Sequence, residues 1–220
     1  MIRTIIFDLD GTLIDTEKYF KIFWRKAAAV FGYSMSEEQA LQLRSLGRPY
    51  APALLKEWYG EDFDYVAVRE CRRKMMKELL DAEGIELKPG AKQALKWLLE
   101  QGYRTALATA TPKERAAEQL REVGLDGYLE KIVSASQVEK GKPAPDVYLA
   151  ACRELNALPE ECLAVEDSPN GVNSALAAGL KVVMVPDQTL PDEALREKLY
   201  ACIPTLFELP ELLDGKSRMK

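Results

Sequence analysis

The spacing of apolar side chains changes twice along the chain, and these changes predict three segments. Residues Arg3 to Phe7 form a short run of mostly β-branched and aromatic side chains, which predicts a buried strand ending at Asp8. From about Thr16 to Leu80 the apolar residues recur at helical spacing, and no convincing strand pattern interrupts them. After Pro89 and Gly90, helix patterns and strand patterns alternate strictly. The sequence therefore predicts a first strand, a helical block and a long alternating segment.

The helical block contains several predicted helices. In the first of them Phe20, Phe23, Trp24, Ala27 and Phe31 follow the i, i+3, i+4 rule of one helix face, and Gly32 marks the end. Further helices are expected at about residues 36–43, 50–59 and 65–80. This block is therefore predicted to form one all-helical unit.

The alternating segment predicts the fold class. Helices are expected at about residues 91–101, 113–123, 146–155 and 171–178, and strands at 105–109, 131–134, 162–166 and 181–185. Strict alternation is typical of an α/β fold with a doubly wound, Rossmann-like parallel sheet. We therefore expect a core made of residues 1–14 and 86–220, with residues 15–85 inserted after the first strand as a helical cap domain.

In such sheets, ligands bind outside the carboxyl ends of the strands. Residues with chemical function stand at or just beyond the predicted strand ends in four places, which are Asp8-Leu9-Asp10-Gly11-Thr12, Thr109-Ala110-Thr111, Lys140-Gly141-Lys142-Pro143 and Glu166-Asp167-Ser168.

Several of these residues are acidic. Asp8 and Asp10 share a face of an extended segment, and Glu166 and Asp167 close a second strand. Carboxylates that meet at one sheet edge repel one another unless a cation lies between them, and Mg2+ prefers such oxygen ligands and also bridges to phosphate. Each Asp alone could be an N-cap or a turn residue, but the four strand ends together favour a metal site.

The remaining two strand ends suggest phosphate binding. Thr111-Pro112-Lys113-Glu114 has the pattern of a capping box, which predicts a helix N-terminus aimed at the sheet edge and suited to a phosphate. We expect Thr111 to be only the cap and Thr109 to offer its hydroxyl to a ligand. Lys142 lies in a Gly-Pro turn, where a lysine is usually solvated, but facing carboxylates and a phosphate would need its charge.

Composition excludes several kinds of chemistry and partner. The 220 residues include no histidine, which rules out a Ser-His-Asp triad and imidazole metal ligands. The net charge of −5 argues against a nucleic-acid binder, and the best basic cluster, Arg69 to Lys77, is interleaved with Glu70 and Glu78 and reads as a solvated helix face. Four cysteines without a CxxC pair and no run of about 20 apolar residues predict a cytoplasmic protein with reduced thiols and no membrane span.

Taken together in order and spacing, these motifs resemble the four motifs of the haloacid dehalogenase (HAD) superfamily. The sequences concerned are Phe7-Asp8-Leu9-Asp10-Gly11-Thr12, Thr109, Gly141-Lys142-Pro143-Ala144-Pro145-Asp146 and Glu166-Asp167-Ser168-Pro169-Asn170-Gly171. The helical insertion after the first motif resembles the branch that contains β-phosphoglucomutase and phosphoglycolate phosphatase. The resemblance covers nearly the whole chain.

The resemblance implies roles for the motif residues. Asp8 would be the nucleophile that forms an aspartyl-phosphate, and Asp10 the general acid and base. Thr109 and the backbone amide of Ala110 would hold phosphoryl oxygens, and Lys142 would orient Asp8 and the phosphate. Mg2+ would be bound by Asp8, the backbone carbonyl of Asp10 and Asp167, with Glu166 adjacent to it or one contact further out.

In this family the cap closes over the site and supplies substrate contacts. Candidates are Thr16, Glu17, Arg44, Arg48 and Lys77, of which Arg48 resembles the specificity-loop arginine of the mutase branch. Its guanidinium suits a second phosphate or a carboxylate, although each basic residue could equally be an ordinary exposed one.

One departure from the family bears on the activity. β-Phosphoglucomutases carry a histidine on the first cap helix where this chain has Phe20 or Tyr19. The resemblance therefore favours hydrolysis over a hexose-phosphate mutase, which stays the alternative. A phosphonate hydrolase with Lys18 or Lys21 as a Schiff-base lysine is a weaker possibility.

The expected protein is a monomeric, Mg2+-dependent phosphatase for a small phosphate ester, such as a sugar phosphate. Two alternative functions from other classes of protein remain. A receiver-like signalling domain also gathers carboxylates, Thr and Lys at strand ends, but it is about half this length and its phosphoacceptor follows an internal strand. A catalytically dead binding protein is expected to lose a charged group, whereas Asp8, Asp10, Lys142 and Asp167 are all present.

Overall fold

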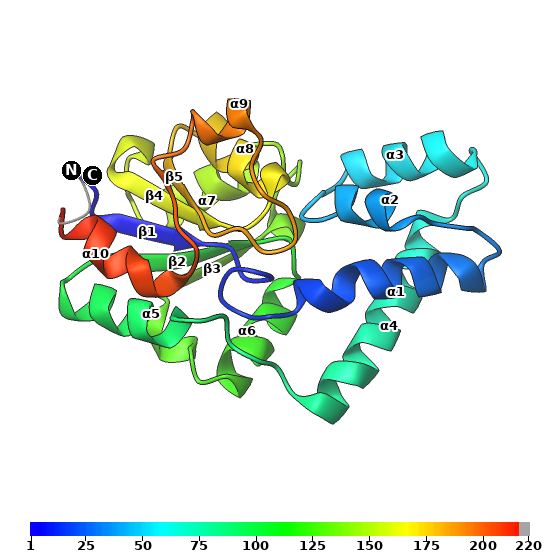
Figure 1. Cartoon of the computed structure of the whole chain (residues 1–220), viewed down its shortest axis with the longest axis horizontal. Coiled ribbons are helices and arrows are strands. Elements are labelled where there is room, and N and C mark those ends of the chain that lie inside the picture. Colours follow the sequence, from blue (N-terminus) through cyan, green and yellow to red (C-terminus); the bar gives the residue numbers. More distant parts are fainter. Residues whose placement is uncertain (216–220) are drawn as a thin grey trace.

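The computed structural model describes residues 1–215 and contains a six-stranded parallel sheet (Figure 1). The strand order is β3-β2-β1-β4-β5-β6, so that the first strand of the chain lies inside the sheet. The strands are β1 (Thr4–Phe7), β2 (Arg104–Thr109), β3 (Lys131–Ser134), β4 (Cys162–Glu166), β5 (Lys181–Met184) and β6 (Ala201–Cys202). The α/β fold with a doubly wound parallel sheet is confirmed. Strand β6 was not predicted, because two residues are too few to give a pattern.

Helices cover both faces of the sheet, and the alternation of side chains along β1 shows why. Ile5 and Phe7 belong to an apolar cluster with helices α5, α6 and α10, whereas Ile6 belongs to a second cluster with α7, α8 and α9. The helices are α5 (Ala91–Glu100), α6 (Lys113–Glu122), α7 (Asp146–Glu154), α8 (Pro169–Ala177), α9 (Glu193–Arg196) and α10 (Leu209–Leu213). Short 3-10 turns lie at Asp126–Tyr128, Ala135–Gln137, Pro159–Glu161 and Leu206–Glu208.

Four further helices form a cap beyond the carboxyl ends of the strands, on the right of Figure 1. They are α1 (Glu17–Val30), α2 (Glu37–Gln42), α3 (Tyr50–Tyr59) and α4 (Tyr65–Glu83), and no strand interrupts them. The cap has an apolar cluster of its own, in which Trp24 of α1, Leu55 of α3 and Val68 of α4 are buried. The inserted all-helical block is therefore confirmed.

The chain enters and leaves the cap at neighbouring points. Ile14 and Leu87 form an isolated antiparallel bridge, the Asp15 amide donates to the carbonyl of Glu86 at 2.8 Å, and the Lys88 amide donates to that of Leu13 at 3.0 Å. These contacts support the predicted boundary between residues 1–14 and 86–220 and residues 15–85. The division into two domains stays a prediction, and residues 216–220 lie outside the described part.

Two expectations about the chemistry of the chain can be compared with the described residues. All four cysteines are free thiols, with the sulfur atoms of Cys152 and Cys162 3.7 Å apart. Among the helices of residues 1–215, none combines the length and apolar character needed to cross a membrane.

Candidate active site

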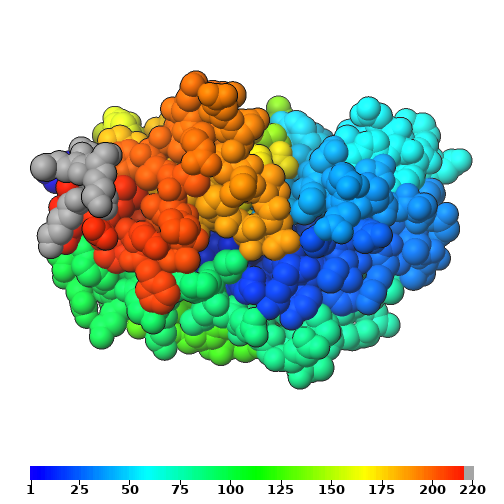
Figure 2. All heavy atoms as spheres, in the orientation of Figure 1, coloured from blue at the N-terminus to red at the C-terminus, as the bar shows by residue number. Residues whose placement is uncertain are grey.

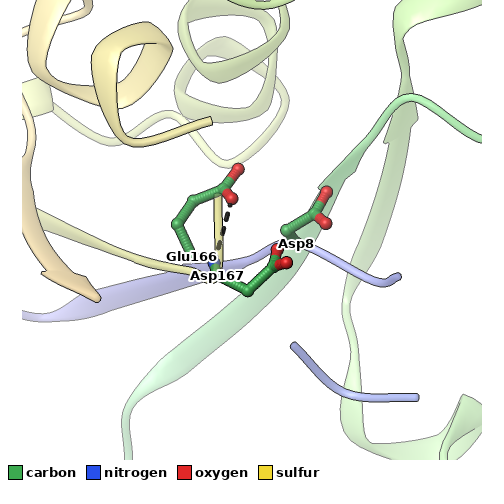
Figure 3. A group of neighbouring side chains, drawn as sticks. All are labelled: Asp8, Glu166 and Asp167. Atoms are coloured by element: carbon green, nitrogen blue, oxygen red, sulfur yellow. Dashed lines mark hydrogen bonds between the residues drawn. The ribbon is translucent and has the colours of Figure 1, made fainter. Parts of the chain in front are cut away.

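Three carboxylates converge where β1 and β4 end (Figure 3). Asp8 follows β1, Glu166 is the last residue of β4, and Asp167 comes next. One oxygen from each lies within 4.8 Å of the others, and all three side chains are buried. The Asp8 amide donates to the Val165 carbonyl at 3.0 Å, which continues the strand pairing and holds Asp8 beside the end of β4. The predicted convergence of acidic strand ends is present in the structure.

Lys142 pairs with two of these carboxylates. Its Nζ lies 2.6 Å from Asp8 Oδ1 and 2.5 Å from Glu166 Oε1, and its side chain is fully buried. Burial lowers the pKa of Lys142, but the charges of Asp8 and Glu166 outweigh it and leave the pKa above its usual value. Burial raises the pKa of Asp8 well above its ordinary range, and the charge of Lys142 opposes this shift. Lys142 is thus a fixed cation at the strand ends rather than a solvated lysine.

Glu166 is held on all sides by the protein. Besides Lys142, the Tyr148 hydroxyl donates to Oε1 at 2.7 Å and the Asp167 amide donates to Oε2 at 3.2 Å. A Cβ on Gly171 would lie about 2.0 Å from this carboxylate, so only glycine lets α8 approach it. Sequence reasoning did not identify Tyr148, because a tyrosine on an apolar helix face looks like an ordinary core residue.

Asp167 is paired with a cation from the cap. The Arg44 guanidinium forms a buried ion pair with Asp167, its Nε donates to Glu17 Oε2 at 3.1 Å, and its Nη1 donates to Thr189 Oγ1 at 3.1 Å. Burial raises the pKa of Asp167 well above its usual range, and the charge of Arg44 opposes that shift. Burial likewise raises the pKa of Glu17 to about 8. Of the cap candidates, Arg44 and Glu17 therefore reach the sheet edge.

Asp10 is oriented by two hydroxyls. Thr16 Oγ1 donates to Asp10 Oδ1 at 2.6 Å, and Thr111 Oγ1 donates to Asp10 Oδ2 at 2.7 Å. The prediction that Thr111 caps α6 is wrong, since the N-cap is Pro112 and no side chain caps the helix. Thr109 is fully buried, and its Oγ1 accepts a hydrogen bond from the Thr111 amide at 3.0 Å.

A cavity of about 1030 Å³ lies between the cap and the strand ends. Five of the predicted site residues line it, which are Asp8, Asp10, Ala110, Arg48 and Lys77. The other four, Thr109, Lys142, Glu166 and Asp167, are fully buried. In Figure 2 the orange surface that follows β5 meets the blue surface of the cap. The cavity has the size of a small-molecule site.

The basic residues of the cap differ in their surroundings. Arg48 is exposed at the cavity, and Lys77 is mostly exposed and paired with Asp81. The expectation that Arg69 to Lys77 is a solvated helix face is wrong for Arg72, which is only 8% exposed and lines the cavity. Its position four residues after the buried Val68 was the available signal, because residues i and i+4 share a helix face.

The two candidate Schiff-base lysines are surface groups. Lys18 pairs with Asp15 and Glu86, and Lys21 pairs with Glu37. The hydrogen bonds from Lys18 to Asp15 and Glu86 raise its pKa, whereas an amine nucleophile needs a lowered one. This arrangement does not favour a phosphonate hydrolase in which one of these lysines forms a Schiff base.

The donor set fits a hard divalent cation. Two buried cations, Lys142 and Arg44, pair with the carboxylates of Asp8, Glu166, Glu17, Asp167 and Asp187, and Asp10 adds a further carboxylate at the cavity. Both oxygens of Glu166 and both oxygens of Asp167 accept hydrogen bonds from the protein, whereas within the described residues only Oδ1 of Asp8 does, so Asp8 has the most available oxygen for a metal. The excess of negative charge in a buried site is the condition that a divalent ion relieves.

Comparison with known proteins points to the same family as the motifs that form this site. The family described as haloacid dehalogenase-like hydrolase matches residues 5–185. A "phosphorylated carbohydrates phosphatase" of Thermotoga maritima is 34% identical over 185 residues, covering 81% of this chain and 82% of that protein. CbbY from Rhodobacter sphaeroides, solved in complex with phosphate, is 26% identical with a TM-score of 0.78 and covers 95% of this chain and 96% of its own.

A third comparison concerns the fold alone. The β-phosphoglucomutase of Clostridium difficile superimposes with a TM-score of 0.82 at 22% identity, over 98% of this chain and 99% of that one. The chain belongs to the haloacid dehalogenase-like hydrolase family, among its phosphatases. It is an enzyme, a phosphoric monoester hydrolase of that family.

Proposed function

We propose that this protein is a Mg2+-dependent phosphatase that hydrolyses a small phosphorylated metabolite, a sugar phosphate, through an aspartyl-phosphate intermediate. The observation that carries the proposal is Asp8, a buried carboxylate that reaches the cavity and is held by Lys142. Asp10, oriented by two threonine hydroxyls, lines the same cavity. The named activity of the Thermotoga maritima relative, a phosphatase of phosphorylated carbohydrates, supports the choice of substrate.

In the proposed reaction, an Asp8 oxygen attacks phosphorus and the bond from phosphorus to the ester oxygen breaks. Asp10 gives its proton to the departing oxygen and later takes a proton from the water that attacks the aspartyl-phosphate. Water then forms the new bond to phosphorus, so inorganic phosphate leaves and Asp8 is restored. The bonds from Thr16 and Thr111 fix Asp10 for both transfers.

The phosphoryl oxygens need donors and positive charge. We propose that the backbone amide of Ala110 and the Thr109 hydroxyl contact them, and that Lys142 orients Asp8 while contributing its charge. Glu166 is a positioning residue, because it contacts Lys142 and Tyr148. Arg48 and Lys77 are proposed to contact the substrate from the cap side of the cavity.

Asp8, Asp167 and the backbone carbonyl of Asp10 are the proposed holders of Mg2+. When bound, the ion would supply positive charge to the phosphoryl oxygens and reduce the repulsion between the carboxylates. The protein residues then have the tasks of presenting Asp8, orienting Asp10 and closing the cavity.

Asp8→Asn tests the proposed nucleophile. Hydrolysis of p-nitrophenyl phosphate is expected to fall by about a thousand-fold or more, because an amide cannot form the phosphorylated intermediate. Asp62→Asn, at an exposed cap position, is the control and is expected to keep full activity. Mass spectrometry of acid-quenched wild-type enzyme is expected to find a phosphoryl group on Asp8. Substantial activity of Asp8→Asn would contradict the proposal.

Removal of divalent metal tests the proposed dependence on Mg2+. Treatment with EDTA is expected to abolish hydrolysis, because the carboxylates then repel both one another and the incoming phosphate. Added Mg2+ is expected to restore the rate. Full activity in EDTA after exhaustive dialysis would show that the reaction needs no metal.

A hexose-phosphate mutase remains the second candidate, favoured by the close fold likeness to β-phosphoglucomutase. Phe20 or Tyr19 stands in place of that family's histidine, and the lack of an imidazole supports hydrolysis instead; Phe20 lines the cavity. Incubation with a sugar 1-phosphate and a trace of sugar bisphosphate separates the two. Free phosphate is the expected product, whereas an isomeric sugar phosphate would identify a mutase.

We further propose that the enzyme is cytoplasmic, which the free thiols support, and that it acts as a monomer. Size-exclusion chromatography with light scattering is expected to give a mass near 24.7 kDa.

A further inference from the structure

Two buried hydrogen-bond donors in the cap have no acceptor within the described residues. They are Nε of Arg72 on α4 and Nε1 of Trp24 on α1. Both side chains are more than nine-tenths buried, and both line the cavity that also contains Asp8 and Asp10. Unmade hydrogen bonds of buried donors are costly, so their presence at a cavity wall indicates a ligand that supplies the acceptors.

The two donors are held together by aromatic packing. The guanidinium carbon of Arg72 lies 4.4 Å from the ring centre of Phe20 and 5.1 Å from that of Trp24. Its Nη1 contacts only a weak acceptor, the sulfur of Met76, at 3.8 Å. The ring of Phe20 thus forms a platform for the Arg72 guanidinium. The guanidinium is therefore fixed before any ligand arrives.

Arg72 also lacks an ion pair within the described residues, whereas its neighbours Arg69 and Arg73 both pair with Glu70. Burial and the nearby charges of Arg73 and Arg69 lower the pKa of Arg72 to about 10, while Glu17 and Asp10 act in the opposite direction. At neutral pH it stays a cation. A buried cation without a carboxylate partner is expensive unless a ligand provides the anion.

The charge of the cavity wall indicates the kind of ligand. The cap side is lined by more basic than acidic residues, the basic ones being Arg48, Arg69, Arg72, Arg73, Lys74 and Lys77 and the acidic ones Glu17 and Glu70. The core side presents Asp8 and Asp10, where the proposed function puts the reacting phosphate. A second anionic group on the same molecule would meet the cap side.

We propose that Arg72 and the indole N–H of Trp24 form a subsite for a second anionic group of the substrate, a phosphate or a carboxylate. This inference rests on the proposed phosphatase function, since the first phosphate is taken to lie at Asp8. The preferred substrates are then phosphate esters that carry two anionic groups, namely sugar bisphosphates or phosphorylated sugar acids.

Matched substrates test the subsite. Glucose 6-phosphate, 6-phosphogluconate and glucose 1,6-bisphosphate differ in whether a carboxylate or a second phosphate is present. Wild-type kcat/KM is expected to be at least about tenfold higher for one of the two doubly anionic esters than for glucose 6-phosphate. Which of the two is preferred distinguishes a phosphate from a carboxylate subsite.

Arg72→Met is expected to reduce this preference by about 10- to 100-fold, mainly through the KM of the doubly anionic ester. Arg72→Lys is expected to restore part of it, because the charge returns without the planar fork. Trp24→Phe keeps an aromatic ring but removes the N–H donor. It is expected to reduce the preference for the doubly anionic ester several-fold. Arg121→Met, an exposed arginine of α6, is the control.

Binding to Asp8→Asn protein, measured by calorimetry, separates this inference from the proposed function. Glucose 1,6-bisphosphate or 6-phosphogluconate is expected to bind more tightly than glucose 6-phosphate, and addition of Arg72→Met is expected to remove the difference. Equal losses for all esters, or no preference in the wild type, would overturn the subsite. A preference in binding with no hydrolysis of any phosphate ester would overturn the phosphatase and leave the subsite standing.

Discussion

The hydroxyl of Tyr148 connects a core helix to the proposed catalytic lysine. It donates to Glu166, which in turn accepts a hydrogen bond from Lys142. Tyr148→Phe is expected to lower kcat by about tenfold with little change in KM, because Lys142 loses part of its support. The expected loss in unfolding free energy is about 1–2 kcal/mol.

Steady-state kinetics and urea unfolding measure these two effects. The matched control is Tyr33→Phe, a cap tyrosine that packs against Tyr59 and Phe63. It is expected to leave kcat unchanged. An unaltered kcat in Tyr148→Phe would mean that Lys142 holds its position without the tyrosine.

Single residues were predictable where the local sequence determines their place. Asp8 and Asp167 could be assigned to the sheet edge because apolar strand runs stop there. Lys142 followed from the charge that facing carboxylates need and from the family motif, because its Gly-Pro turn alone is typical of a solvated lysine. The burial of Arg72 was missed, because its spacing from Val68 was the one local signal and the burial itself depends on Phe20 and Trp24 of another helix. Thr111 was misread because a capping pattern does not show that its hydroxyl binds Asp10 instead.

At the scale of elements, a cap loop and a core loop touch through their backbones. The Gly47 amide donates to the Lys142 carbonyl at 2.7 Å, and the Gly141 amide donates to the Arg48 carbonyl at 2.8 Å. A Cβ on Gly47 would lie 2.6 Å from the Gly141 Cα, closer than two such atoms can approach. The absence of a side chain at both glycines lets the cap meet the segment that carries Lys142.

Gly47→Ala is therefore expected to lower kcat/KM by about tenfold or more, because the displaced loop carries Lys142 away from Asp8. Thermal unfolding is expected to change little, since both apolar cores are untouched. Gly127→Ala is the control, because a Cβ there meets no atom within 4 Å. Normal kcat/KM in Gly47→Ala would show that this contact is not needed for turnover.

The strands and α-helices up to β5 followed from the sequence, and those after β5 did not. Strands β1 to β5 and helices α1 to α8 carry enough apolar residues to show a period. Strand β6 and helices α9 and α10 have at most five residues, so their form depends on packing against the rest of the sheet. The approach of the two glycine loops is a tertiary contact and leaves no periodic signal.

At the scale of the whole molecule, Arg44 joins the cap to the core. Its guanidinium contacts Glu17 of the cap and Asp167 of the core, with Asp187 at 3.8 Å, and all three carboxylates are buried. Arg44→Met leaves Glu17 and Asp167 without this cation, while Asp187 keeps its pair with Lys88. Without metal, the free energy of unfolding is expected to fall by about 3–5 kcal/mol.

Urea unfolding with and without Mg2+ measures this loss in the free energy of unfolding of Arg44→Met. Mg2+ is expected to stabilise Arg44→Met more than the wild type, because in the variant Asp167 lacks the positive charge of Arg44 and the ion replaces it. Lys56→Met, which breaks an exposed pair with Glu61, is expected to cost less than about 1 kcal/mol. Equal stability of Arg44→Met and wild type in EDTA would contradict the role given to Arg44.

The place of β1 inside the sheet has a consequence for how the protein is made. Its neighbours are β2, which begins at Arg104, and β4, which begins at Cys162. During synthesis the four helices of the cap leave the ribosome before either neighbour exists, and their apolar cluster is built from their own residues. The central strand therefore waits without a partner while the cap can already fold, and nascent chains that end shortly after Glu83 are expected to bind chaperones through residues Thr4–Phe7.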